Sequence, residues 1–181
     1  LILVSYNTFS QCNKEETINI EGGDTYVGCL NDRGLQEGFG TYTFSDGSKL
    51  YEGNWKDGKY DGKGTLYDSN GGKKSGIFKN DMLNYGTYHF ENEEFTSDYT
   101  GGFGDNGLPK GDGDLTTTTK EYTEVKKGKF INGDLFNGES ITKYNNGLRI
   151  TEEIEMAEVV SALITTKEYT EVKKGKFING D

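Results

Sequence analysis

The chain has 181 residues, which fits one domain, and only 31% of them are apolar, with 12 tyrosines and 10 phenylalanines prominent among them. This composition disfavours a deep aliphatic core and favours a thin sheet with one aromatic face. The net charge of −10 excludes nonspecific nucleic-acid binding, which needs a basic surface, and opposes simple adhesion to an anionic membrane.

Residues 1–22 form an N-terminal arm that opens on a short apolar run. The run fits the remnant of a secretory signal peptide, which favours a secreted or cell-envelope location; an ordinary first strand is the alternative and leaves the cytoplasm open. The two cysteines of the chain are Cys12 in this arm and Cys29 beyond it. A disulfide between them would tie the arm to the first hairpin, although their spacing alone does not decide it.

Residues 23–150 contain a repeat, marked by a glycine that precedes a large apolar residue by two positions. The first five such glycines are spaced 25, 23, 25 and 27 residues apart: Gly28, Gly53, Gly76, Gly101 and Gly128. A nearly fixed period of this length is typical of stacked repeats, each too small to bury its apolar face alone.

The second repeat, residues 51–71, shows the structure that each repeat is predicted to form. Apolar residues alternate from Tyr51 to Trp55, as in a half-buried strand. Asp-Gly turn signals follow, Gly64 to Tyr67 provides a return strand, and Asn70-Gly71 turns the chain again. The repeats are therefore predicted to be β-hairpins in an antiparallel meander of about five units. In the third repeat, Asp81-Met82 occupies the position where the other repeats usually have a turn glycine.

The pattern Y-x-G-x-W-x-x-G-x-x-x-G-x-G-x-x-x-x-x-x-G over residues 51–71 resembles the MORN repeat. Residues 26–47 match it well and residues 76–147 in degraded form, so the resemblance covers roughly two thirds of the chain. It implies an elongated, open antiparallel sheet of stacked hairpins. It does not imply one function, because similar repeats accompany lipid kinases, methyltransferases and membrane-junction proteins.

The last two segments differ from the array. Residues 151–164 are predicted to form a short helix that closes it, because Thr151 can cap and Ile154, Val160 and Ile164 share a helical face. A partner-binding helix, or a strand through Val159, are the alternatives. Residues 165–181 repeat residues 118–134 without a change, and are expected to be a tail or one added edge strand.

No arrangement of residues indicates an enzyme, a cofactor or a metal site. The single histidine, His89, lies between Tyr88 and Phe90 and has no nucleophile near it in sequence. The segment from Gly101 to Asn106 approaches a calcium-binding nonapeptide, but its aspartate is one place early and the unit does not recur.

The sequence therefore predicts a non-catalytic scaffold that binds a protein partner or a second copy of itself. Its partner-binding residues are predicted on the aromatic face: Trp55, Tyr60, Tyr67, Phe78, Tyr88 and Phe103. The alternative is a lipid or membrane surface bound by the section 56–79, which carries six lysines against three aspartates: Lys56, Lys59, Lys63, Lys73, Lys74 and Lys79. Residues 81–115 are acidic by contrast, with eight acids against Lys110.

Overall fold

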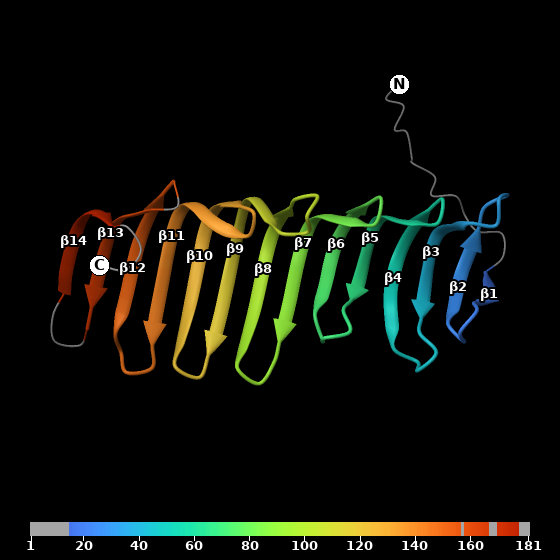
Figure 1. Ribbon diagram of the computed structural model, residues 1–181, viewed down its shortest axis with the longest axis horizontal. Helices are drawn as coiled ribbons and strands as arrows, with labels where there is room; N and C mark the ends of the chain where they lie inside the picture. The colour runs from blue at the N-terminus through green and yellow to red at the C-terminus, as the bar shows by residue number, and fades with distance from the viewer. Residues whose placement is uncertain (1–14, 157, 167–169, 178–181) are drawn as a thin grey trace, which may run out of the picture. The chain divides into compact units, whose positions relative to one another are not determined.

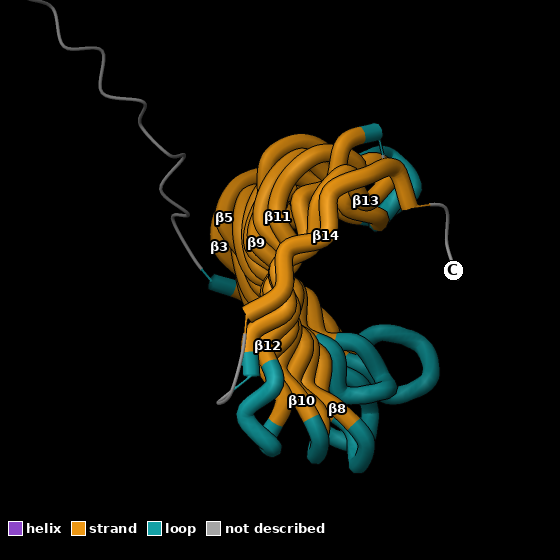
Figure 2. The backbone as a smooth tube through the Cα atoms, turned by 90° about the vertical axis from the view of Figure 1, so that its left-hand side faces the viewer, coloured by secondary structure: helices purple, strands orange, loops and turns teal. Residues whose placement is uncertain are grey.

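The computed structural model describes residues 15–156, 158–166 and 170–177, and Figure 2 shows these residues as strands joined by loops, with no helix among them. The described residues form fourteen strands: β1 (Glu16–Asn19), β2 (Thr25–Leu30), β3 (Gln36–Thr43), β4 (Lys49–Lys56), β5 (Lys59–Tyr67), β6 (Lys73–Lys79), β7 (Met82–Glu91), β8 (Phe95–Phe103), β9 (Pro109–Thr119), β10 (Tyr122–Ile131), β11 (Asp134–Tyr144), β12 (Arg149–Glu155), β13 (Glu158–Thr165) and β14 (Thr170–Phe177).

The chain divides into two compact units, and strand β6 contributes to both. Among the described residues, the first unit contains residues 15–67 and 76–82, and the second contains 68–75 and the residues from 83 onward. In the first unit β1 to β5 pair antiparallel in chain order. In the second unit β7 to β14 do the same (Figure 1). Both units are thus antiparallel meanders of hairpins, which confirms the predicted all-β architecture.

The helix predicted over residues 151–164 is wrong, because this segment forms β12 and β13. Ile150 lies opposite Thr142 of β11, and Thr151 lies opposite Ile141. The backbone of β11 offers a full ladder of hydrogen bonds, and the β-branched Ile150, Thr151 and Ile154 suit that ladder better than a helix. The capping and charge signals that favoured a helix are local and weaker than strand pairing.

The two ends of the chain extend the sheets where the structure describes them. In the N-terminal arm, β1 pairs with β2, so Glu16–Asn19 belong to the first sheet. Residues 1–14, including Cys12, lie outside the described residues, so the signal-peptide interpretation and the Cys12–Cys29 pairing stay predictions. In the duplicated C-terminal segment, β14 pairs with β13.

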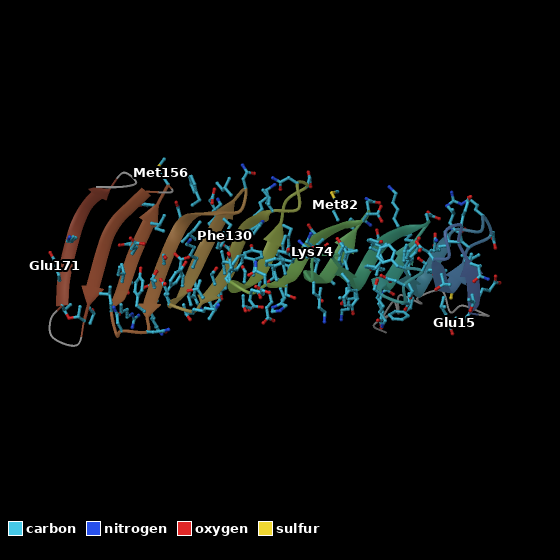
Figure 3. All side chains as sticks on the ribbon, turned by 60° about the horizontal axis from the view of Figure 1, so that its bottom comes forward. Glu15, Lys74, Met82, Phe130, Met156 and Glu171 are labelled. Carbon is cyan, nitrogen blue, oxygen red and sulfur yellow. The ribbon has the colours of Figure 1, made fainter. Side chains whose placement is uncertain are left out.

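Each unit has its own aromatic core on one face of its sheet. In the first unit the buried side chains are Tyr26, Tyr51, Trp55 and Phe78. In the second unit they are Leu83, Tyr99, Phe103, Phe130 and Leu135; the labelled Phe130 lies on β10 in Figure 3. Aromatic rings cover enough area to bury one another across neighbouring strands without a second layer.

Candidate interaction surfaces

Each buried tyrosine ring of the two cores lies over a pair of glycines that face each other across two strands. Tyr51 covers Gly53 and Gly64, and a Cβ added at Gly64 would lie closer than 3.0 Å to the hydroxyl and ring of Tyr51. The same arrangement holds at two further sites: Tyr26 over Gly28 and Gly40, and Tyr99 over Gly101 and Gly113. The glycines of the repeat therefore leave the space that the ring fills.

The hydroxyl groups of these tyrosines are bonded inside the chain. Tyr26 donates to the carbonyl of Cys29 at 3.1 Å, Tyr51 to that of Asn54 at 3.0 Å, and Tyr99 to that of Gly102 at 3.0 Å. Burial raises the pKa of Tyr26 to about 12 and also raises those of Tyr51 and Tyr99. These phenols are neutral structural groups, not candidates for acid–base chemistry.

Trp55 is the centre of the aromatic cluster in the first unit. Its ring meets Tyr26 edge-on at a centroid distance of 5.4 Å and Tyr51 at 5.1 Å, while Tyr60 stacks on Tyr51 at 3.8 Å. The indole Nε1 donates to the carbonyl of Gly40 at 3.1 Å. Because its polar atom is bonded and its ring is covered, Trp55 holds three strands together.

The six residues predicted to bind a partner have different surroundings. Trp55, Phe78 and Phe103 are buried, with exposed fractions of 6%, 1% and 8%. The other three are half-buried: Tyr60, Tyr67 and Tyr88. A partner that contacts the first three must first displace core side chains, whereas Tyr67 lines a groove on the surface of the first unit.

This groove lies on the opposite face of the first unit, and of its lining residues the sequence predicted Tyr67 and Lys63 as site residues but not Phe39 or Ile77. Side chains alternate between the two faces of a strand. Because Gly53 faces the ring of Tyr51, its neighbours Glu52 and Asn54 point to the other face. The groove measures about 640 Å³, and the residues that line it are Phe39, Glu52, Gly53, Asn54, Lys63, Gly64, Thr65, Tyr67, Gly76 and Ile77.

Two apolar side chains of the groove project into solvent. Phe39 is 60% exposed and Ile77 is 41% exposed. Both occupy positions next to a repeat glycine, since Phe39 precedes Gly40 and Ile77 follows Gly76. The alternation of side chains along a strand could have identified them from the sequence. A large apolar residue next to a glycine that faces the core must point to the opposite face of the sheet.

The lysines of the lipid-binding alternative do not all remain available. In the first unit Lys56, Lys59 and Lys63 are exposed, but the Nζ of Lys79 lies 2.9 Å from Asp61. In the second unit Lys73 is exposed, and Lys74 lies 3.9 Å from Asp68 and 5.2 Å above the ring of Tyr88. Ion pairs and a cation–π contact thus occupy part of the predicted basic surface.

His89 lies on an exposed strand surface of the second unit. Its Nδ1 is 2.7 Å from Oδ1 of Asp98, the residue opposite it on β8. Within the described ranges, no group of three or more His, Cys, Asp or Glu side chains is arranged to hold a metal ion. In the part of the chain that the structure describes, no helix has the length and apolarity needed to span a membrane.

Comparison with known proteins identifies the repeat. The sequence profile of the MORN repeat matches residues 32–49 and 51–73. MORN repeat-containing protein 3 of Xenopus laevis is 40% identical over an alignment of 81 residues, and the alignment covers 40% of this chain and 33% of that protein. The chain thus spans about a third of the length of this relative. The second matched segment, residues 51–73, includes the glycine pair Gly53 and Gly64 together with Tyr51, which covers it.

Proposed function

This chain is a MORN-repeat protein, and we propose that it is a non-catalytic scaffold that binds a protein partner or a second copy of itself through the surface of its repeat sheets. The observation that carries this proposal is the groove of the first unit, where Phe39 and Ile77 stand exposed beside a floor of glycines. Exposed apolar side chains grouped on a concave surface are typical of interaction sites.

The groove has the chemical features of a protein-binding surface. Covering the exposed part of the Phe39 side chain removes roughly 100 Å² of apolar area from water and contributes about 2.5 kcal/mol to binding. The glycine floor allows the backbone of a partner to approach closely. Lys63 and Glu52 line the groove with both signs of charge, Glu52 being paired with Lys49, and the amide of Asn54 donates to the carbonyl of Lys63 at 3.0 Å.

The proposal can be tested by removing the two exposed apolar groups. In the variant Phe39→Ser/Ile77→Ser, neither side chain belongs to the buried core, so the sheet is expected to fold. The matched control is Tyr85→Ser, because Tyr85 is an exposed aromatic residue, 57% accessible, in the second unit. Circular dichroism and thermal melts establish that all three proteins are folded to the same extent.

Two measurements then follow on the wild type, the groove variant and the control. One is the solution mass over a wide concentration range by light scattering, and the other is the set of proteins retained from an extract of the source organism. We expect association or retention by the wild type and the Tyr85→Ser control, and its loss from the groove variant. Equal behaviour of the wild type and the groove variant in both measurements would exclude the groove as the binding surface.

A further inference from the structure

Two places in the fold have the same backbone and different side chains. In each, the turn that follows one strand lies beside the turn that follows the next strand but one, and we call such a place a corner. The corner of the first unit joins the turns after β2 and β4, and the corner of the second unit joins the turns after β8 and β10. Figure 1 shows the last two turns at the same edge of their sheet.

The backbone of the two corners is held in the same way. In the first unit the N–H of Gly58 donates to the carbonyl of Gln36, the first residue of β3, at 3.0 Å. In the second unit the N–H of Gly133 donates to the carbonyl of Pro109, the first residue of β9, at the same distance of 3.0 Å. The residues of the two corners can therefore be compared position by position.

In the first unit, side chains join the two turns. The Nδ2 of Asn31 donates to Oδ1 of Asp57 at 2.8 Å, and Arg33 forms an ion pair with the same carboxylate. The backbone N–H of Asp57 donates to the carboxylate of Glu37 at 3.1 Å. The charged groups of this corner thus satisfy one another within the chain.

In the second unit all four of these positions have changed. Their occupants, in the same order of position, are Gly104, Asn106, Lys110 and Asn132. The side-chain bond between the two turns now runs from Nδ2 of Asn106 to Oδ1 of Asn132 and is long, at 3.4 Å. Where the first unit has its ion pair, the second unit has a hollow of about 510 Å³.

Positive charge exceeds negative charge in the lining of this hollow. Lys110 and Lys129 line it together with one acid, Asp105, so the lining has a net charge of two minus one, or +1. In the described part of the chain neither lysine forms an ion pair. Asp112 lies opposite Lys129 on β9, just outside the lining. One carboxylate matches this balance, whereas the two charges of a phosphate would exceed it.

Apolar surface lies next to the two lysines. Ile131 lines the hollow and is 40% exposed. The stem of Lys110 lies against Gly104, since a Cβ added there would be 3.4 Å from Cδ of the lysine. Because the lining side chains Asp105, Asn106 and Ile131 are exposed, the hollow is an open depression. A small free acid would remain largely in water there, whereas a peptide can cover the rim as well.

We propose that this hollow binds the acidic side chain of a protein segment in which apolar residues flank the acid. The carboxylate lies between Lys110 and Lys129, and a neighbouring apolar side chain of the segment covers Ile131. The site is additional to the groove of the first unit, because it lies in the second unit and takes a charged group. The two sites share no lining residue, so the failure of one leaves the other standing.

The ligand chemistry can be tested on the full chain, labelled with ¹⁵N, by NMR titration with short peptides. The probes are acetyl-Leu-Glu-Leu-amide and its neutral counterpart acetyl-Leu-Gln-Leu-amide. We expect the glutamate peptide to shift the backbone amide signals of residues 104–111 and 129–132, and to bind about tenfold or more tightly than the glutamine peptide. A third probe, 4-methylpentanoate, is an apolar free acid and should bind more weakly than the glutamate peptide; equal affinity would overturn the assignment to a peptide.

A closed variant tests the location. Asn106→Arg/Asn132→Asp introduces the ion pair that Arg33 and Asp57 form in the first unit. It is expected to fold, because Asn132 has a φ of 52° and Asp57 a φ of 51°. We expect this variant to lose the binding of the glutamate peptide while its melting temperature stays at or above that of the wild type.

A charge reversal completes the test. Lys110→Glu introduces the residue type of the equivalent Glu37 and is expected to abolish binding of the glutamate peptide. The matched control, Lys120→Glu, makes the same change of charge at an exposed turn residue and should bind the peptide like the wild type. Equal affinity of the wild type for the glutamate and glutamine peptides would overturn the proposal even if a variant fails to fold. Binding retained by both folded variants would overturn it as well.

Discussion

The most direct perturbation of this fold is the addition of one methyl group beneath a tyrosine ring. Gly64 is suited to this test because its backbone is not in the left-handed region, so alanine brings a steric effect alone. The new Cβ would lie within 3.0 Å of the hydroxyl and two ring carbons of Tyr51. Tyr51 is fully buried, and its hydroxyl is bonded to the carbonyl of Asn54 at 3.0 Å.

The ring of Tyr51 cannot move aside without cost. It is stacked on Tyr60 at 3.8 Å and meets Trp55 and Phe78 edge-on at 5.1 and 5.3 Å. Overpacking of a well-filled core costs about 1–3 kcal/mol, and this site belongs to the upper half of that range because the ring is confined on several sides. For a chain of this length a loss of about 2–3 kcal/mol lowers the melting temperature by roughly 4–12 °C.

Urea denaturation followed by the fluorescence of the single tryptophan, Trp55, measures the effect next to the site of the change. The decisive comparison repeats Gly64→Ala in a Tyr51→Leu background, where the smaller side chain leaves space, so the cost of the alanine should fall below about 1 kcal/mol. The control is Gly47→Ala, where nothing lies within 4 Å and the positive φ of +88° is the sole obstacle. An equal cost of Gly64→Ala with Tyr51 and with Leu would refute the reasoning.

Two further predictions concern a turn and the buried phenols. Asp81 has a positive φ of +71°, and its side chain accepts a hydrogen bond from the backbone N–H of Tyr60 at 2.8 Å. In urea denaturation Asp81→Asn should therefore be as stable as the wild type, Asp81→Gly should be less stable because it loses the hydrogen bond, and Asp81→Ala should lose about 1–2 kcal/mol because it loses the hydrogen bond and is strained at positive φ. Any other order of stability would contradict this account of Asp81. Burial raises the pKa of Tyr26 and of Tyr60 from 10.0 to about 12, so between these values the unfolded chain has released protons that the folded chain retains. Stability should therefore be intact below pH 10 and fall as the pH rises toward 12, with tyrosinate absorption appearing together with unfolding; a constant melting temperature across this window would contradict it.

The sequence was sufficient for the architecture because its signals agree at several levels. Strand alternation from Tyr51 to Trp55, the Asp57-Gly58 turn and the paired glycines all require the same hairpin. The turn has the two positive φ values, 51° and 80°, that suit a two-residue connection between twisted strands. The same local signals recur along the chain, and their repetition outweighs the defects of single units.

The helix between residues 151 and 164 shows where that reasoning fails. The capping residue, the two acidic residues and the apolar stripe indicate the structure that the isolated segment would favour. In the folded chain β11 lies beside the segment and offers a strand edge for pairing, and that edge is present because the preceding repeats have folded. In a repeat protein each unit is stabilised by its neighbour. A segment with both helical spacing and β-branched residues therefore follows the neighbour, and the isolated pattern carries less information than its position after a hairpin.

Phe39 and Ile77 were not predicted as site residues for a related reason, which concerns the two faces of one strand. Large aromatic residues suggested a binding face, but in a single-layer sheet those residues must first form the core, and Trp55, Phe78 and Phe103 are buried for that purpose. A thin sheet has no second layer to cover its opposite side, so one apolar residue there remains in water. Phe39 and Ile77 are such residues. For this fold the informative feature in the sequence is therefore an apolar residue next to a glycine that faces the core. Such a residue points away from the core, so core packing does not explain its apolar character.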